Sequence, residues 1–205
     1  MKLNPLLDDP LAVVISQTVV SEPVAWDDYH RGALQTVTAM QVELEGKDVV
    51  IKPNVTVGER YADPDSGITT HPGFVHGVID YLLAHGANQG RITILEDPRN
   101  TDDDTPRHWR GTGYPDVRER TGTELRSPTT DTCVKRPVPH PHCHNEVRVS
   151  QLAVASGAVL INVPKMKTHN LGITTLSLKN LMGVVNVFDR HYCGQALREL
   201  PEAEQ

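Results

Sequence analysis

The sequence predicts an α/β protein in which helices flank a mostly parallel sheet, with Rossmann-like layering. Short apolar, β-branched segments predict four strands, at 11–16, 48–51, 91–95 and 158–161. Two segments with apolar residues at helical spacing, 29–42 and about 70–85, alternate with the first three strands. Right-handed crossovers place the helices of such an alternating chain against the faces of a parallel sheet.

Glycine and proline mark the boundaries of the first elements. Gly46 follows the first helix, and the strand at 48–51 runs directly into Lys52, Pro53 and Asn54. Because proline cannot donate to a sheet ladder, we expect the strand to stop there. Lys52 and Asn54 are then left at its carboxyl end.

The second helix is predicted to begin at the sequence Thr70, His71, Pro72. Threonine is common near helix caps, and proline is favoured in the first helical turn. The third strand then ends in Glu96 and Asp97. One helix start and one further strand end therefore add polar side chains to the same edge of the predicted sheet.

The middle of the chain has weaker patterns. It predicts a short helix at 114–120, a weak strand near Leu125, an edge strand at 146–149, and a short helix or turn at 151–156. The segment 127–145 shows no periodicity and contains several prolines, so we expect an irregular loop there.

A histidine and cysteine tract lies in this loop, at His140, His142, Cys143 and His144. Imidazole and thiolate groups suit zinc, nickel or copper, so the tract is a candidate metal site. The alternative is a proline-rich loop without a metal, because spacing alone does not set the ligand geometry.

A basic segment follows the fourth strand. It contains Lys165, Lys167 and His169 at alternating positions, then Thr174 and Thr175, and then a predicted amphipathic helix with Lys179 and Asn180. Between 151 and 188 the chain has no Asp, Glu or Arg, so no acidic residue nearby in the sequence neutralises the lysines. Free N–H groups at a helix start, the helix dipole and the lysine charges can together hold an anion. The alternative is that these lysines extend to a solvated edge.

Composition restricts the possible functions. A net charge of -6 and a pI near 5.9 argue against general nucleic-acid binding. No apolar stretch approaches the length of a signal peptide core or a membrane span, which predicts a cytoplasmic protein. The three widely spaced cysteines form neither a disulfide framework nor an iron–sulfur motif.

The length predicts a single domain over 11–200. After Gly183 the sequence stays apolar to Phe188 and then predicts a charged helix through Leu200. Because no closing strand follows, we expect the domain to continue beyond the given C-terminus. The alternative is a small complete domain.

Four segments resemble the prokaryotic family called domain of unknown function 362. They are Lys52-Pro53-Asn54, the Thr70 to Pro72 helix start, Pro164-Lys165-x-Lys167-Thr168-His169, and Thr175-x-x-x-Lys179-Asn180-Leu181-Met182-Gly183. The resemblance spans roughly Val13 to Gly183 and implies the fold more than a reaction. Some family members continue into a four-cysteine ferredoxin module, which implies a possible redox partner, but this chain has no such cluster motif.

The predicted strand and helix ends converge on one edge, where an open α/β sheet binds its ligands. The leading hypothesis is a small carboxylate or phosphate held by Lys165 and Lys167, with His169 and Lys167 as candidate catalytic residues. Further candidate ligand-binding residues are Lys52, Asn54, Thr70, His71, Asp97, Thr174, Thr175, Lys179 and Asn180. The alternatives are a redox partner of iron–sulfur proteins and a metal-binding accessory protein that uses the histidine tract. The sequence indicates no specific cofactor.

Overall fold

The computed structural model describes residues 12–40, 44, 46–55, 63–96, 109–128, 133–141, 144–169, 173–186 and 189. Its centre is a four-stranded sheet in the order β3-β2-β1-β6. The strands are β1 Val49–Pro53, β2 Ile92–Leu95, β3 Glu124–Arg126 and β6 Val159–Val163, and every neighbouring pair is parallel. This confirms the predicted α/β fold with a parallel sheet.

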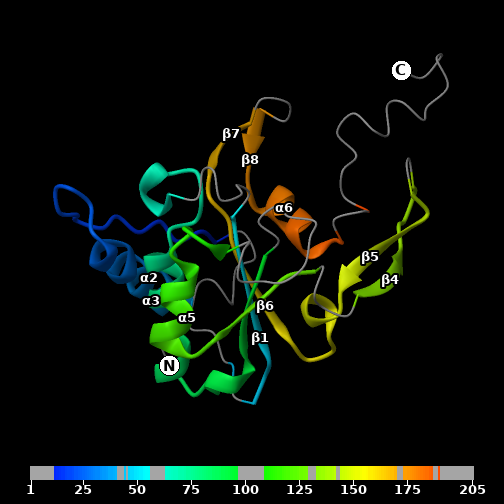
Figure 1. The fold of residues 1–205 in the computed structure, drawn as a ribbon, viewed down its shortest axis with the longest axis horizontal. Coiled ribbons are helices and arrows are strands. Elements are labelled where there is room, and N and C mark those ends of the chain that lie inside the picture. The colour runs from blue at the N-terminus through cyan, green and yellow to red at the C-terminus, as the bar shows by residue number, and fades with distance from the viewer. Residues whose placement is uncertain are drawn as a thin grey trace.

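Three helices cover one face of this sheet (Figure 1). They are α2 Trp26–Met40, α3 Pro72–Ala84 and α5 Tyr114–Thr121. The larger apolar core lies between these helices and the strand residues Val49, Ile51, Ile92 and Ile94. The helices at 29–42 and 70–85 and the short helix at 114–120 are thus confirmed, with boundaries shifted by a few residues.

The opposite face carries a smaller apolar cluster. Val50 and Leu95 alternate with the residues of the larger core and pack against Val184 on the other side of the sheet. Val184 belongs to the 3₁₀ helix η5 Leu181–Val184, which follows the short helix α6 Ser177–Asn180. Because both faces of the sheet are covered by apolar residues, the sequences of its strands are apolar at consecutive positions.

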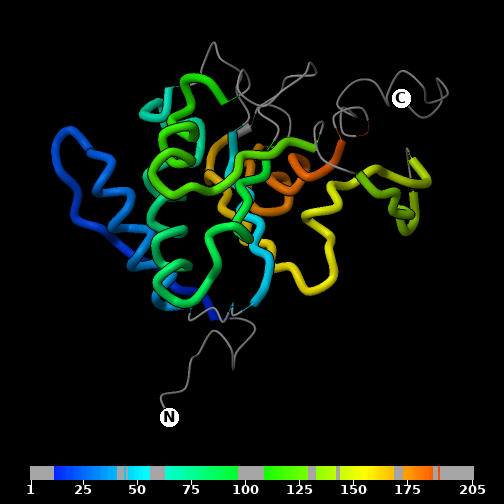
Figure 2. Tube along the Cα trace, turned by 60° about the horizontal axis from the view of Figure 1, so that its bottom comes forward, coloured from blue at the N-terminus to red at the C-terminus, as the bar shows by residue number. Residues whose placement is uncertain are grey.

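Two antiparallel ribbons extend from this body, as Figures 1 and 2 show. One consists of β4 Cys133–Pro137 and β5 Glu146–Ser150, and the other of β7 Lys167–His169 and β8 Ile173–Thr175. Short 3₁₀ helices complete the described elements, at η2 Pro64–Ser66, η3 Gln89–Arg91 and η4 Leu152–Val154. Within the described ranges, no helix has both the length and the apolar character needed to span a bilayer.

The first ribbon corrects the prediction of irregular structure throughout 127–145, because β4 lies inside that segment. Pro137 pairs with Glu146 at the end of the ladder. In a two-stranded ribbon both strands are edge strands, where a terminal proline does not interrupt the pairing. The prolines therefore end β4 but do not exclude it.

The N-terminal prediction was wrong. The described part of the predicted strand, residues 12–16, belongs to no strand, and the side chains of Val13 and Ile15 are 79% and 90% exposed. Residues further along this segment contact α2 instead, through Thr18 with Gln35 and Arg31 with the Val19 carbonyl. β-Branched composition favours a strand only where a partner strand is available.

Candidate functional site

The carboxyl ends of three parallel strands place polar groups along one border of the sheet, which we call its carboxyl edge. β1 ends in Lys52 and Pro53, β2 is followed by Glu96, and Asn162 on β6 lies opposite Lys52 in the register. Val50 faces the side of the sheet that η5 covers. Because strand side chains alternate, Lys52, two residues after Val50, emerges on that same side.

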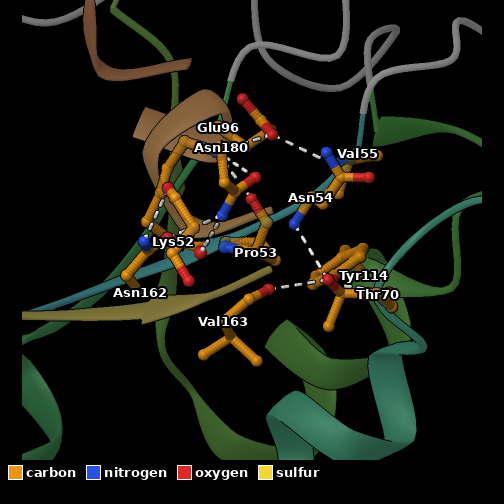
Figure 3. A network of polar contacts seen from close by, with 11 residues as sticks. Lys52, Pro53, Asn54, Val55, Thr70, Glu96, Tyr114, Asn162, Val163 and Asn180 are labelled. Atoms are coloured by element: carbon orange, nitrogen blue, oxygen red, sulfur yellow. Dashed lines mark hydrogen bonds and ion pairs between the residues drawn. The ribbon is translucent and has the colours of Figure 1, made fainter. Parts of the chain in front are cut away.

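A buried ion pair forms the centre of this edge (Figure 3). Lys52 Nζ lies 2.7 Å from Glu96 Oε2, and the two side chains are 0% and 3% exposed. Lys52 Nζ also donates to the carbonyl oxygen of Pro53 at 2.6 Å and to Asn180 Oδ1 at 3.4 Å. An ammonium group has three donor hydrogens, and these acceptors are enough to engage them. Glu96 Oε2 also accepts from the Val55 amide at 3.0 Å.

Asn180 joins α6 to the strands beneath it. Its Nδ2 donates to the carbonyl oxygen of Lys52 at 3.0 Å and to Asn162 Oδ1 at 2.7 Å. Asn162 in turn donates to the Ser177 carbonyl oxygen at 2.9 Å. Both ends of the Asn180 amide are therefore hydrogen bonded within the protein.

Gly183 lets η5 pack directly on the ion pair. A Cβ atom at this position would lie 2.7 Å from Lys52 Nζ and closer still to Glu96 Oε1. The family-like sequence from Lys179 to Gly183 thus has a structural explanation. Asn180 hydrogen bonds to the network, and Gly183 leaves the space that the network occupies.

Thr70 connects three segments beside the ion pair (Figure 3). These are the residue that follows β1, the end of β6 and the start of α5. Thr70 N donates to Asn54 O at 2.8 Å, and Asn54 N donates to Thr70 Oγ1 at 3.0 Å. Thr70 Oγ1 donates to Val163 O at 2.7 Å, and Tyr114 Oη donates to Thr70 O at 2.9 Å. Burial raises the pKa of Tyr114 well above its usual value, so its hydroxyl stays a donor.

His71 caps helix α3. Its Nδ1 accepts the Gly73 amide at 3.0 Å, its ring stacks on Tyr29 with centroids 3.7 Å apart, and its Nε2 lies 3.3 Å from Asp65 Oδ1. Burial lowers the pKa of His71, although Asp65 opposes this, and the nearby Lys165 lowers it further. The neutral ring is the form that caps the helix, because a protonated Nδ1 cannot accept.

Lys167 and His169 lie in β7 of the second ribbon, whereas Lys165 precedes this ribbon and Lys179 lies in α6. Thr174 and Thr175 were expected to precede a helix directly, but they belong to β8 and pair with Thr168 and Lys167. Lys167 Nζ donates to the Ile68 carbonyl oxygen at 2.9 Å. α6 is only four residues long, so it supplies little of the helix dipole that the sequence had suggested.

The structure thus brings together Lys52, Asn54, Thr70 and Asn180 in adjoining networks at one edge. It places His140 and His144 elsewhere, as exposed residues of the segment that joins β4 to β5. Several predicted residues lie outside the described part of the chain, namely Asp97, His142, Cys143 and the side chain of His169, as does the predicted helix through Leu200. Sequence reasoning did not single out Tyr114 or Asn162, and it gave Gly183 no role beyond its place in the family-like segment, because these roles arise from contacts distant in sequence.

A family model described as a domain of unknown function, DUF362, matches residues 49–199. The chain belongs to the DUF362 family. The matched region begins at the first residue of β1 and contains the whole Lys52, Glu96 and Asn180 network. Searches of curated proteins and of solved structures found no match. Helix α2 lies before the matched DUF362 region.

Proposed function

We propose that the carboxyl edge of the sheet binds a small anion, a carboxylate or a phosphate. In this proposal Lys165, Lys167 and Lys179 supply the positive charge. Lys52 and Asn180 have a structural role at this edge, because their polar atoms already form hydrogen bonds within the protein.

The main support for this proposal is the balance of charges at the carboxyl edge. Glu96 is neutralised by Lys52, and the sequence from 151 to 188 contains no acidic residue. Among the residues that the structure describes, no carboxylate lies within ion-pair distance of Lys165 or Lys179. Lys165 and Lys179 therefore keep their charge beside an edge whose own acid is already paired, and an anion is the natural complement.

Lys167 lies against the segment that precedes α3, because its Nζ donates to the carbonyl oxygen of Ile68. Lys165 is near enough to His71, at the start of α3, for its charge to lower the pKa of that ring. Thr175 lies directly opposite Lys167 in the ladder, which places their side chains on one face.

Two buried polar atoms in this region have no partner within the described structure, Thr175 Oγ1 and Asn54 Oδ1. A buried polar group without a hydrogen bond is costly, so such groups often mark a position where a ligand or water completes the bonding. A hydroxyl group can donate to an anion, and Thr175 is the better placed of the two because it lies opposite Lys167.

For the chemistry, we propose His169 as general acid or base and Lys167 as the charged group beside it. His169 lies two residues after Lys167 in β7. An imidazole group exchanges protons near neutral pH, and a neighbouring ammonium group stabilises negative charge that develops on a substrate.

Thermal melts in chloride and sulfate at matched ionic strength test the binding. We expect sulfate to raise the Tm of the parent more than that of Lys165→Met or Lys179→Met, because an anion that binds the folded state stabilises it. Direct titration with inorganic phosphate should show about 10- to 100-fold weaker binding in these variants, the loss of one charge-assisted hydrogen bond.

Lys135→Met is the matched control, because Lys135 is an exposed lysine that pairs with Glu146 on the other ribbon. It should retain the full response to sulfate and phosphate. Equal sulfate shifts in the parent, the control, Lys165→Met and Lys179→Met would refute the proposed anion site.

A further inference from the structure

Helices α2 and α3 bring two histidines and an aspartate together outside the carboxyl-edge network. His30 Nε2 lies 2.8 Å from Asp80 Oδ2, and His76 Nε2 lies 3.5 Å from the same oxygen. The two imidazole centroids are 4.8 Å apart. One nitrogen or oxygen from each of the three residues falls within 4.8 Å of the others.

A closely packed helix pair holds these groups. His76 and Asp80 are four residues apart on α3, so they occupy one face of that helix. His30 reaches them from α2, whose backbone comes unusually close at Gly77. A Cβ atom at Gly77 would lie 2.8 Å from Ala33 Cβ and closer still to the His30 carbonyl oxygen. The spacing of the two helices is therefore set at the point where the three side chains converge.

We propose that His30, His76 and Asp80 bind a divalent transition-metal ion of the zinc class. Two imidazoles and one carboxylate are a donor set that zinc, nickel and iron(II) accept. Zinc at about 2.0 to 2.1 Å from each ligand atom in a tetrahedron requires ligand separations of about 3.3 Å. The two separations to Asp80 Oδ2, 2.8 and 3.5 Å, bracket that value, and the ligand atoms of the two histidines lie within 4.8 Å of each other, so they must come closer when an ion binds.

The cluster is open enough to admit an ion. His30, His76 and Asp80 are 25%, 16% and 42% exposed, so the carboxylate meets solvent while the rings are largely enclosed. With three protein ligands, a tetrahedral ion has one further position for water or a small ligand.

Trp26 provides a contact that opposes metal binding. Its Nε1 donates to His76 Nδ1 at 3.2 Å. Since indole nitrogen only donates, this bond keeps the His76 proton on Nε2, the atom that faces Asp80. A metal on Nε2 moves the proton to Nδ1 and breaks the bond to Trp26. Removing that donor by Trp26→Phe should therefore tighten metal binding, by about 2- to 10-fold for one neutral hydrogen bond.

The test is a titration of the full chain with Co²⁺, followed through the visible absorption of the bound ion, with displacement by Zn²⁺. We expect one ion per chain in the parent and at least about 100-fold weaker binding in His30→Gln, His76→Gln and Asp80→Asn, since even residues that only orient a ligand change affinity 10- to 100-fold. Zn²⁺ should also raise the Tm of the parent and not of these variants.

Two controls separate this site from others. His85→Gln changes another histidine at the end of α3, which stacks on Tyr81 outside the cluster. The double variant His140→Ala/His144→Ala changes the tract on the β4–β5 ribbon. Both should bind Co²⁺ like the parent.

The absence of stoichiometric binding in the parent would overturn the proposal, and so would loss of the ion in the His140→Ala/His144→Ala variant alone. An unchanged affinity in Trp26→Phe would overturn the assignment of His76 Nε2 as a ligand. Circular dichroism of each variant, before metal is added, shows that a weaker response does not come from unfolding.

Discussion

Lys52 and the lysines near the second ribbon come from similar sequence contexts, at the ends of apolar strands or on a short helix, yet their environments differ. Lys52 is fully buried and paired with Glu96. Lys165 and Lys179 are partly exposed, and among the described residues no carboxylate lies within ion-pair distance of either. An apolar neighbourhood in the sequence therefore does not determine what a lysine does. The decisive factor is whether an acidic residue from another strand reaches it.

The two groups differ in energetic terms as well. Removing Lys52 and Glu96 from water is expensive, and the loss is offset only by their attraction and by the surrounding hydrogen bonds. A partly exposed lysine keeps most of its hydration and contributes little to the free energy of unfolding. The first group is therefore expected to act on stability and the second on binding.

Lys52→Met should have the largest effect. It leaves Glu96 as a buried charge without its partner, which typically costs about 3 to 5 kcal/mol of unfolding free energy. Urea unfolding of Lys52→Met measures this. Lys165→Met is the matched control from the other group and should stay within about 0.5 kcal/mol of the parent.

The double variant Lys52→Met/Glu96→Gln sharpens this test. It removes both charges, while the introduced glutamine side chain keeps an acceptor for the Val55 amide. The double variant should recover part of the stability that Lys52→Met loses. If Lys52→Met proves as stable as Lys165→Met, the contrast between the two groups of lysines does not hold.

Gly183→Ala should have the next largest effect, since its methyl group would enter the space held by the ion pair. Overpacking of this kind costs about 1 to 3 kcal/mol. Gly90→Ala is a suitable control, because a Cβ there makes only ordinary contact with Asn88 at 3.5 Å. Thermal or urea unfolding compares the two, and similar stabilities would contradict the close packing of η5 on Lys52.

The smallest effect concerns His71, another buried titratable group near the same edge. Burial lowers the pKa of His71 in the folded state, so between that pKa and the usual value near 6.5 the unfolded chain binds more protons. The free energy of unfolding should therefore fall as the pH decreases below about 6.5, by less than about 1.4 kcal/mol per pH unit for this group.

Urea unfolding between pH 7.5 and 5.5 measures that slope. His71→Asn should have a shallower slope than the parent, and a residual slope is expected because burial also lowers the pKa of His76. An identical slope in His71→Asn and the parent would show that protonation at Nδ1 does not compete with the helix cap.

The sequence by itself determined the parallel sheet, the helices that cover it and the places where its strands end. Apolar periodicity and proline act over a few residues, so the strand that stops at Pro53 and the helix that starts at Pro72 were predictable. The family-like segments likewise pointed to Lys52, Thr70 and Asn180, which the fold brings to one edge.

Only the tertiary structure decided which of these groups pair. Lys52 and Glu96 are 44 residues apart, Lys52 and Asn180 are 128 apart, and His30 and Asp80 are 50 apart. Such contacts depend on strand register and on how closely Gly77 and Gly183 let segments approach. No local pattern encodes those distances, because they are set by the packing of whole elements. The ribbon that contains Lys167 and Thr175 could not be predicted from the sequence for the same reason. Its pairing depends on the register of two strands, which no local pattern specifies.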